Sequence, residues 1–282
     1  MSDLKRRYLE EGYVVIPDLV PRKAIRDILD EMTQVFLARR LGRFPGTEEL
    51  AAADLDALLA ESFVEDFAGY HGAAKLTNHL ISLHRLSVAP AVVDTLRILG
   101  LAFPAICARP LVWFHAPHLA RTERYHRLPA HQEWSNMQGS LDGCVVWLPL
   151  VPIEPEMGRL QVIPRSHAWD LLPFAKDEAK DYPLSIDPAQ IDDEEFVEVD
   201  VPAGSALFFS SFLVHRSGTN GTSKARLTAN FRFNNAAEPS FIAREYLNPF
   251  HYAVAEGLKH PGFPQPGAVA RLLGERLPLA AE

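Results

Sequence analysis

The chain has 282 residues, near the upper size of a single hydrophobic core; 48% of them are hydrophobic and 23% are charged. This composition is typical of a folded globular protein and argues against extensive disorder. The formal net charge of −8 argues against a general binder of nucleic acid or of anionic membranes, because contacts with phosphate need an excess of Lys and Arg.

Targeting and redox signals are weak in this sequence. The basic residues near the start are not followed by an apolar stretch, so we predict no signal peptide. No apolar run approaches the roughly 20 residues that span a bilayer. The two cysteines, Cys107 and Cys144, are too few for a disulfide framework and suit a reducing compartment. We therefore predict a cytoplasmic protein.

The first hundred residues predict mainly helices. After Pro21, which suits the first turn of a helix, apolar residues recur at helical spacing. Residues 47–67 are rich in Ala, Leu and acidic residues and predict a further helix. Another helix is expected at residues 90–99, with Gly100 as its stop. A short strand is predicted before all of these, at residues 12–17.

From about residue 105, short β-type runs broken by Pro and Gly predict a sandwich or jelly roll rather than βαβ units. We predict strands at residues 111–115, 143–150, 160–163, 195–201, 206–209 and 226–233. The acidic stretch 174–194 carries two prolines and predicts an inserted loop or lid. We predict one domain over residues 1–282, with mainly helical support (1–104), a β core (105–235) and a C-terminal extension (236–282).

The central motif is His131-Gln132-Glu133, followed much later by His215. Residues two apart on a strand point to the same face, so His131 and Glu133 could bind one ion. His215 from a distant strand would complete a set of two histidines and one carboxylate, which ferrous iron uses for oxygen chemistry because three positions stay open. By itself the tripeptide is weak, since a chain of this composition contains about one His-x-acid match by chance.

Arg226 strengthens the case for a metal site. It follows His215 by 11 positions and begins a predicted strand. Its planar guanidinium could pair with both oxygens of a carboxylate, as the distal carboxylate of 2-oxoglutarate requires. Standing alone, Arg226 would be interpreted as a solvated surface residue.

The order of the motifs resembles that of the phytanoyl-CoA dioxygenase-like family of Fe(II)- and 2-oxoglutarate-dependent oxygenases. The elements that carry the resemblance are His131-Gln-Glu133, Gly158-Arg-Leu-Gln-Val-Ile-Pro-Arg-Ser-His167, Pro202-Ala-Gly-Ser205, His215-Arg-Ser-Gly-Thr-Asn220 and Arg226. Five elements in the family's order are far more specific than any one of them. The resemblance covers about residues 105–235 and extends to the N-terminal part only in general character.

This resemblance implies a fold, mainly β with flanking helices, in which a double-stranded β-helix (a cupin-like jelly roll) forms the core. It also implies which residues act at the site: the catalytic metal ligands His131, Glu133 and His215, the 2-oxoglutarate clamp Arg226, its assistant Ser217, and Trp147 as a lining of the co-substrate pocket. An ordinary core tryptophan is an equally good interpretation of Trp147.

The reaction that the resemblance implies is hydroxylation of an unactivated carbon of a small-molecule substrate with O₂, while 2-oxoglutarate becomes succinate and CO₂. Glu133 replaces the family's commoner Asp but remains a carboxylate. Related halogenases lose this carboxylate, so its presence favours hydroxylation. The alternatives are a non-catalytic jelly-roll binding protein and another metal-dependent cupin enzyme, such as an isomerase or a zinc hydrolase. The sequence predicts neither the prime substrate nor the oligomeric state.

Other basic residues near the metal motif admit two interpretations each. His115, His118 and His126 either line the pocket or are ordinary hydrogen-bonded or exposed histidines. The basic run 121–127 either meets an anionic substrate or is a solvated loop. His167, in the Pro-Arg-Ser-His element, is expected to fix a turn rather than to take part in catalysis.

Overall fold

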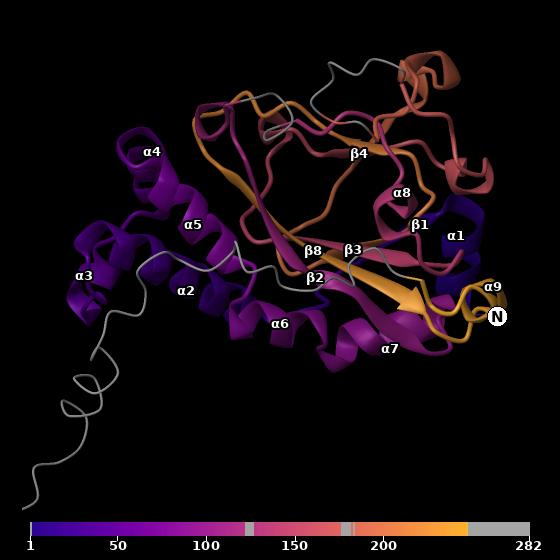
Figure 1. The fold of residues 1–282 in the computed structure, drawn as a ribbon, viewed down its shortest axis with the longest axis horizontal. Helices are drawn as coiled ribbons and strands as arrows, with labels where there is room; N and C mark the ends of the chain where they lie inside the picture. Colours follow the sequence, from indigo (N-terminus) through magenta and orange to yellow (C-terminus); the bar gives the residue numbers. More distant parts are fainter. Residues whose placement is uncertain (1, 122–126, 176–181, 183, 248–282) are drawn as a thin grey trace, which may run out of the picture. The chain divides into compact units, whose positions relative to one another are not determined.

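The computed structural model describes residues 2–121, 127–175, 182 and 184–247 (Figure 1). Its α-helices are α1 (Asp3–Glu11), α2 (Arg22–Leu41), α3 (Thr47–Ala51), α4 (Leu55–Glu65), α5 (Phe67–Thr77), α6 (Ile81–Ser87), α7 (Pro90–Leu99), α8 (Trp134–Met137) and α9 (Pro239–Ala243). Its strands are β1 (Tyr13–Ile16), β2 (Pro104–His115), β3 (Cys144–Pro149), β4 (Leu160–Val162), β5 (Val197–Val199), β6 (Ala206–Ser210), β7 (His215–Ser217) and β8 (Arg226–Asn235).

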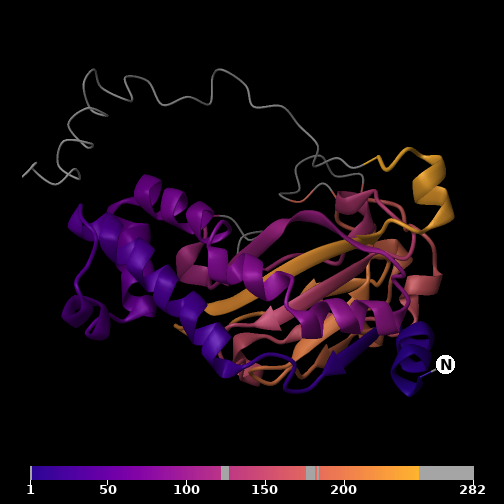
Figure 2. The same cartoon turned by 90° about the horizontal axis from the view of Figure 1, so that it is seen from below.

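The strands form two antiparallel sheets. The larger sheet has the order β1-β6-β3-β8-β2 and the smaller has the order β5-β4-β7. Neighbours in each sheet are far apart in the sequence, which is the connectivity expected of a jelly roll. Helices α5, α6 and α7 pack against β2 of the larger sheet, and α3 and α4 lie farther from the strands (Figures 1 and 2). The predicted jelly roll with flanking helices is confirmed, and the chain as a whole mixes helix and sheet.

Side chains along the central strands point alternately to the two faces of the larger sheet, and this divides the interior into two hydrophobic clusters. On β3, Val146 and its like-facing neighbours pack against the helices, whereas Val145 and Trp147 face the smaller sheet. Strand β6 follows the same rule, with Phe208 on the helix side and Phe209 on the inner side. Successive side chains of a strand point to opposite faces, so each central strand serves both clusters.

The helical character predicted for residues 47–67 is confirmed, but it is divided among three helices, α3, α4 and the start of α5. Asp54 caps α4 by accepting a hydrogen bond from the Ala57 amide at 3.1 Å. Asp66 caps α5 in the same way, accepting from the Gly69 amide at 3.0 Å. An aspartate at a helix N-cap satisfies an amide that has no partner within the helix, so each cap begins a new helix.

Strand β2 begins at Pro104, seven positions before the predicted start at residue 111. Its pairing with β8 shifts between Ala108 and Leu111, where β2 places Arg109 and Pro110 opposite a single residue of β8. This bulge accommodates Pro110, which has no amide proton to give to the ladder. The strand therefore runs through Pro110, the residue just before the predicted start.

Residues 1–250 cluster as one compact unit. Residues 248–282 of the predicted C-terminal extension lie outside the described residues, so the division into domains stays a prediction. No helix in the described part of the chain has both the length and the apolar character needed to cross a membrane.

Candidate functional site

Three buried side chains converge between the two sheets. His131 lies just before α8, Glu133 is the N-cap residue of α8, and His215 is the first residue of β7. Each histidine Nε2 lies 3.9 Å from Oε1 of Glu133, and the three potential ligand atoms lie within 4.8 Å of one another. The structure thus brings together the three residues that the sequence predicts as metal ligands.

Backbone carbonyls fix the orientation of both imidazoles. Nδ1 of His131 donates to the Pro129 carbonyl at 2.8 Å, and Nδ1 of His215 donates to the Leu213 carbonyl at 2.9 Å. A carbonyl only accepts, so the ring proton sits on Nδ1 and the lone pair of Nε2 faces Glu133. Burial lowers the pKa of His215 to about 3. His215 is therefore a neutral imidazole, the form that binds metals.

The local backbone differs from the predicted strand. His131 does pair with His215 in an isolated antiparallel bridge, but Glu133 has helical dihedral angles of −66° and −27°. The side chains of His131 and Glu133 converge because the chain turns from an extended into a helical conformation between them. Gln132 points away and holds neighbouring loops, donating to the carbonyls of Asp170 and Phe212 at 2.8 and 2.7 Å.

Glu133 is held by a residue that sequence reasoning missed. Arg232 on β8 donates from Nε to Oε2 at 2.8 Å and from Nη2 to Oε1 at 2.9 Å, and both residues are buried. Burial alone would raise the pKa of the Glu133 carboxyl, but Arg232 and His131 hold this pKa well below its usual range. The carboxylate therefore stays ionised, with Oε1 facing the two histidines.

A signal for Arg232 is present in the sequence of β8. The strand alternates polar and apolar residues, and all ten of them are buried. The apolar residues, Leu227, Ala229, Phe231 and Phe233, join the cluster on the helix side. The polar residues, Arg226, Thr228, Asn230, Arg232 and Asn234, therefore face the space between the sheets. A buried strand with one polar face indicates a site that holds polar ligands, because buried polar groups need partners.

Arg226 lies on this polar face and is 1% exposed. Its Nη1 makes long contacts of 3.5 and 3.4 Å with the carbonyls of Met157 and Gly218, and its Nε has no hydrogen-bond partner among the described residues. Burial lowers the pKa of Arg226 to about 10, so the guanidinium stays charged at neutral pH. Thr228 Oγ1 and Asn230 Nδ2, farther along the same face, also lack partners among the described residues.

A cavity of about 20 Å³ joins the three predicted ligands to this polar face. Ser217 and Trp147 line it, together with Asn230 and the buried His115. Ser217 and Trp147 thus border the triad, whereas Arg226 does not line this cavity. Trp147 also belongs to the inner hydrophobic cluster. Such a volume admits little more than water, so a dicarboxylate enters only when the lining side chains move apart.

Two of the sequence motifs hold the framework around the site. Ser166 donates to the Ile163 carbonyl at 2.7 Å and accepts from the Val214 amide at 2.9 Å, which ties the end of β4 to the residue before His215. Asn220 donates to the carbonyls of His115 and Lys224, both at 2.8 Å, and so shapes the turn that leads into β8.

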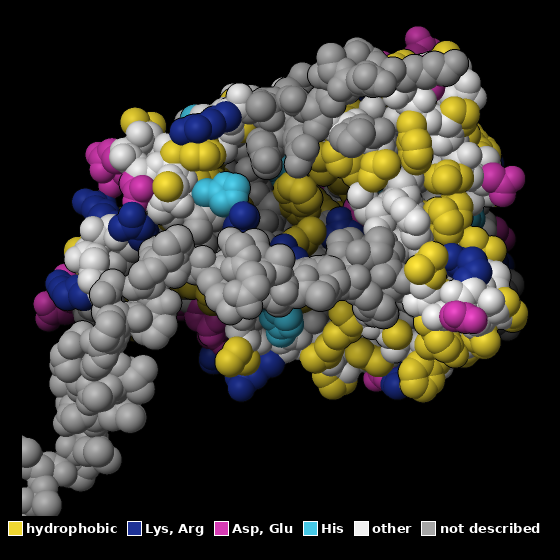
Figure 3. Space-filling model, viewed as in Figure 1, with side chains coloured by type: hydrophobic (Ala, Val, Ile, Leu, Met, Phe, Trp, Pro, Cys, Tyr) yellow, Lys and Arg dark blue, Asp and Glu magenta, His cyan; other side chains and the backbone are white. Residues whose placement is uncertain are grey.

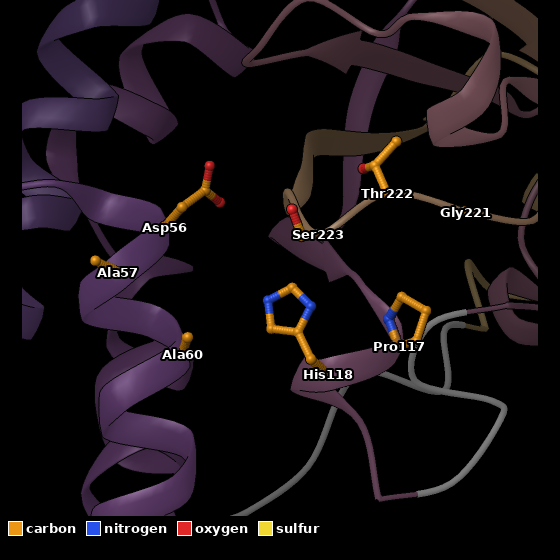
Figure 4. Close-up of a pocket in the computed structure, with 8 residues that line it drawn as sticks. All are labelled: Asp56, Ala57, Ala60, Pro117, His118, Gly221, Thr222 and Ser223. Carbon is orange, nitrogen blue, oxygen red and sulfur yellow. The ribbon is translucent and has the colours of Figure 1, made fainter.

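The other histidines near the motifs lie in different environments. His167 Nε2 donates to the Leu9 carbonyl at 3.0 Å, in keeping with a structural role. His118 is exposed in a separate open groove of about 630 Å³, which lies between α4 and residues 221–223 and contains none of the three predicted ligands (Figure 4). Although this groove is larger than the cavity at the triad, it gathers no comparable set of ligand atoms. His126 and residues 122–125 of the basic run lie outside the described residues.

The predicted insertion at residues 174–194 reaches the site in its described part. The Ile186 amide donates to the Ala130 carbonyl at 2.9 Å, next to His131. The Tyr182 hydroxyl accepts a hydrogen bond from Asn136 Nδ2 at 2.8 Å, and its ring lies edge-on to the His131 ring with centroids 5.3 Å apart. Residues 176–181 and 183 lie outside the described residues, so the lid stays a prediction.

Solved structures with a similar fold support the architecture. The epimerase SnoN, in complex with Fe³⁺, α-ketoglutarate and nogalamycin RO, is 19% identical, with a TM-score of 0.54 and coverage of 89% of this chain and 91% of that one. The non-haem monooxygenase ThoJ is 18% identical, with a TM-score of 0.54 and coverage of 83% and 77%. EctD from S. alaskensis is 15% identical, with a TM-score of 0.52 and coverage of 84% and 78%. At such identities the likeness establishes the fold.

A search of curated protein sequences gives no match. The profile of the phytanoyl-CoA dioxygenase family, in contrast, matches residues 8–228. This range includes most of the N-terminal helices, where the motifs alone indicated only a general likeness. The chain therefore belongs to the phytanoyl-CoA dioxygenase family of Fe(II)- and 2-oxoglutarate-dependent oxygenases, as the order of its motifs predicts.

Proposed function

We propose that this protein hydroxylates an unactivated carbon of a small molecule, using Fe(II) held by His131, Glu133 and His215. The observation that carries the proposal is the convergence of two Nε2 lone pairs and one carboxylate oxygen in a buried site. Such a donor set suits ferrous iron and leaves further positions open. The retained carboxylate of Glu133 favours hydroxylation over halogenation, as it does from the sequence alone.

Arg226 is the residue we expect to bind 2-oxoglutarate. A buried guanidinium without a carboxylate partner among the described residues is costly unless an anion completes it. Its planar fork matches the distal carboxylate of the co-substrate, and Thr228 and Asn230 offer further polar atoms on the way to the triad.

Each part of the chain has a defined task in this mechanism. Backbone carbonyl groups orient the two imidazoles, and Arg232 fixes the plane of the Glu133 carboxylate. Fe(II) and 2-oxoglutarate, when bound, supply the O₂-dependent oxidation that releases succinate and CO₂. Trp147 and Phe209 line the cavity and limit the access of water to it.

Anaerobic loading with Fe(II) and 2-oxoglutarate tests the proposal. We expect the visible charge-transfer absorption of the chelate, and succinate when O₂ is admitted. His131→Ala should abolish both, whereas His118→Ala, a change of an exposed histidine outside the triad, should leave both intact. A chelate without succinate would indicate a binding protein, and metal-dependent activity that ignores 2-oxoglutarate would indicate another cupin enzyme.

The type of oxidation requires a second measurement. We expect the product, once a substrate is found, to gain the mass of one oxygen atom. A product of unchanged mass would contradict hydroxylation while leaving the metal and co-substrate assignments in place.

A further inference from the structure

A second cavity, of about 210 Å³, adjoins the predicted metal ligands. It shares Trp113, Leu128, His131 and Glu133 with the smaller cavity at the triad. A molecule that occupies this space therefore lies against the ligands, where a substrate must be. Figure 3 shows a hollow near the middle of the face turned toward the viewer, with hydrophobic side chains and Lys or Arg side chains inside it.

The charges around this second cavity do not cancel. Its charged lining residues among those described are Arg109, Arg232 and Glu133. Arg232 and Glu133 neutralise each other through their two hydrogen bonds. Arg109 makes no hydrogen bond, ion pair or ring contact with any described residue. Among the described lining residues, one positive charge is therefore unbalanced, although the whole chain has a formal net charge of −8.

The bulge in β2 places Arg109, which is also exposed to solvent, in the lining of this cavity. On a regular strand, Ala108 and Arg109 would face opposite sides of the sheet. Here both line the same cavity, and so does Leu111, because the register shift between Ala108 and Leu111 inserts one extra residue. Bulges re-aim side chains in this way beside active sites. The adjacent Pro110 cannot join the ladder, so the irregularity is encoded in the sequence.

We propose that the substrate of this oxygenase carries an oxyanion, a carboxylate or a phosphate, and that Arg109 binds it. Trp113 and Leu128 contact the apolar body of the same molecule and hold it toward the triad, while Asn136 and Tyr182 border it with polar atoms. Arg226 is set apart from this role because it is fully buried and does not line this cavity. The inference rests on the proposed function and adds a substrate class to it.

Matched probes of one shape test the inference: cyclohexanecarboxylate, cyclohexyl phosphate and the neutral cyclohexanecarboxamide. Each is titrated calorimetrically into the full chain under anaerobic conditions, with Fe(II) and saturating 2-oxoglutarate present. We expect at least one of the two anions to bind about ten-fold more tightly than the amide, a preference typical of one charge-assisted contact. The comparison of carboxylate with phosphate identifies which oxyanion the site prefers.

Two variants assign the preference to its residue. Arg109→Gln should remove the preference for the anion without changing the melting temperature, since Arg109 makes no contact that supports the fold. Arg85→Gln, a change of an exposed arginine on α6, should keep the preference. Equal affinities for anion and amide, binding of no probe, or an unchanged preference in Arg109→Gln would each overturn the inference.

The absorption of the chelate distinguishes a failure of the proposed function from a failure of the proposed substrate class. If the charge-transfer band is absent before any probe is added, the proposed function fails. If the band is normal and persists during the titration but the anion has no advantage, the substrate class alone is wrong.

Discussion

Glu133 and Arg232 form a buried ion pair, so a change at the metal site also changes stability. Glu133→Ala should abolish metal binding and lower the free energy of unfolding by about 3–5 kcal/mol, because it leaves Arg232 buried without its partner. Urea denaturation of the metal-free protein measures this loss. From the sequence alone we expected removal of any predicted ligand to leave the fold largely intact, and the pair alters that expectation for Glu133.

The double variant Glu133→Leu/Arg232→Met is the matched control. It removes both charges at similar volume, so it should recover most of the stability while still failing to bind metal. Equal destabilisation of the single and double variants would show that packing around Glu133, rather than the unpaired charge, causes the loss.

Removal of the Arg226 charge, unlike removal of the Glu133 charge, should weaken ligand binding without lowering stability. Arg226→Met is expected to weaken 2-oxoglutarate binding by about 2–5 kcal/mol, the usual cost of removing one partner of a buried charge pair. The melting temperature of the metal-free protein should stay the same or rise, because the guanidinium has no anionic partner there among the described residues. Titration of 2-oxoglutarate followed by the chelate absorption measures the first effect. A large fall in the melting temperature with unchanged 2-oxoglutarate affinity would instead assign Arg226 a structural role.

At the scale of elements, the segment 174–194 is the part whose role is open to a direct test. Its residue Tyr182 lies edge-on to the predicted ligand His131 and hydrogen-bonds Asn136 on α8. If the segment closes over the site, Tyr182→Ala should increase the 2-oxoglutarate consumed without product, because water and O₂ reach the site more freely. The measurement is succinate formed per substrate oxidised.

Tyr182→Phe separates the ring from the hydroxyl. It keeps the ring contact with His131 and removes the hydrogen bond from Asn136, so its uncoupling should lie between that of the parent chain and that of Tyr182→Ala. Normal coupling in both variants would show that the segment is a passive loop.

At the scale of the whole molecule, the buried triad predicts how stability depends on pH. An unfolded histidine has a pKa of about 6.5, whereas the pKa of His215 in the fold is about 3. Between these values the unfolded chain binds one more proton than the folded chain. The corresponding stabilisation is complete above about pH 6.5 and is lost, by about 1.4 kcal/mol per pH unit, as the pH falls toward 3. The lowered pKa of Glu133 acts in the same direction below its usual value of 4.5.

Urea denaturation of the metal-free protein between about pH 5 and pH 7 tests this dependence. His215→Gln should have a smaller slope by close to one proton, whereas His118→Gln should have the slope of the parent chain. An unchanged slope in His215→Gln would contradict the neutral, buried state of this imidazole.

The sequence by itself determined the local elements and the identity of the family. Short β-type runs between Pro and Gly located β3, β4, β6 and β8, helical spacing located α2, and Gly100 marked the end of α7. The ordered motifs then indicated the family that the profile match confirms. These features are local or ordered along the chain, so they can be recognised without knowing which strands pair.

Only the tertiary structure decided which charges meet. Arg232 pairs with Glu133 across 99 positions, and the bulge of β2 turns Arg109 into the cavity beside the metal ligands. Arg226, in contrast, is buried without a carboxylate among the described residues. Of these three arginines the sequence analysis singled out only Arg226, because the partners of a charged side chain depend on the strands packed around it. Burial and long-range pairing therefore distinguish Arg232, which holds Glu133, from the proposed co-substrate clamp Arg226 and the proposed substrate-binding residue Arg109, and neither property is encoded locally.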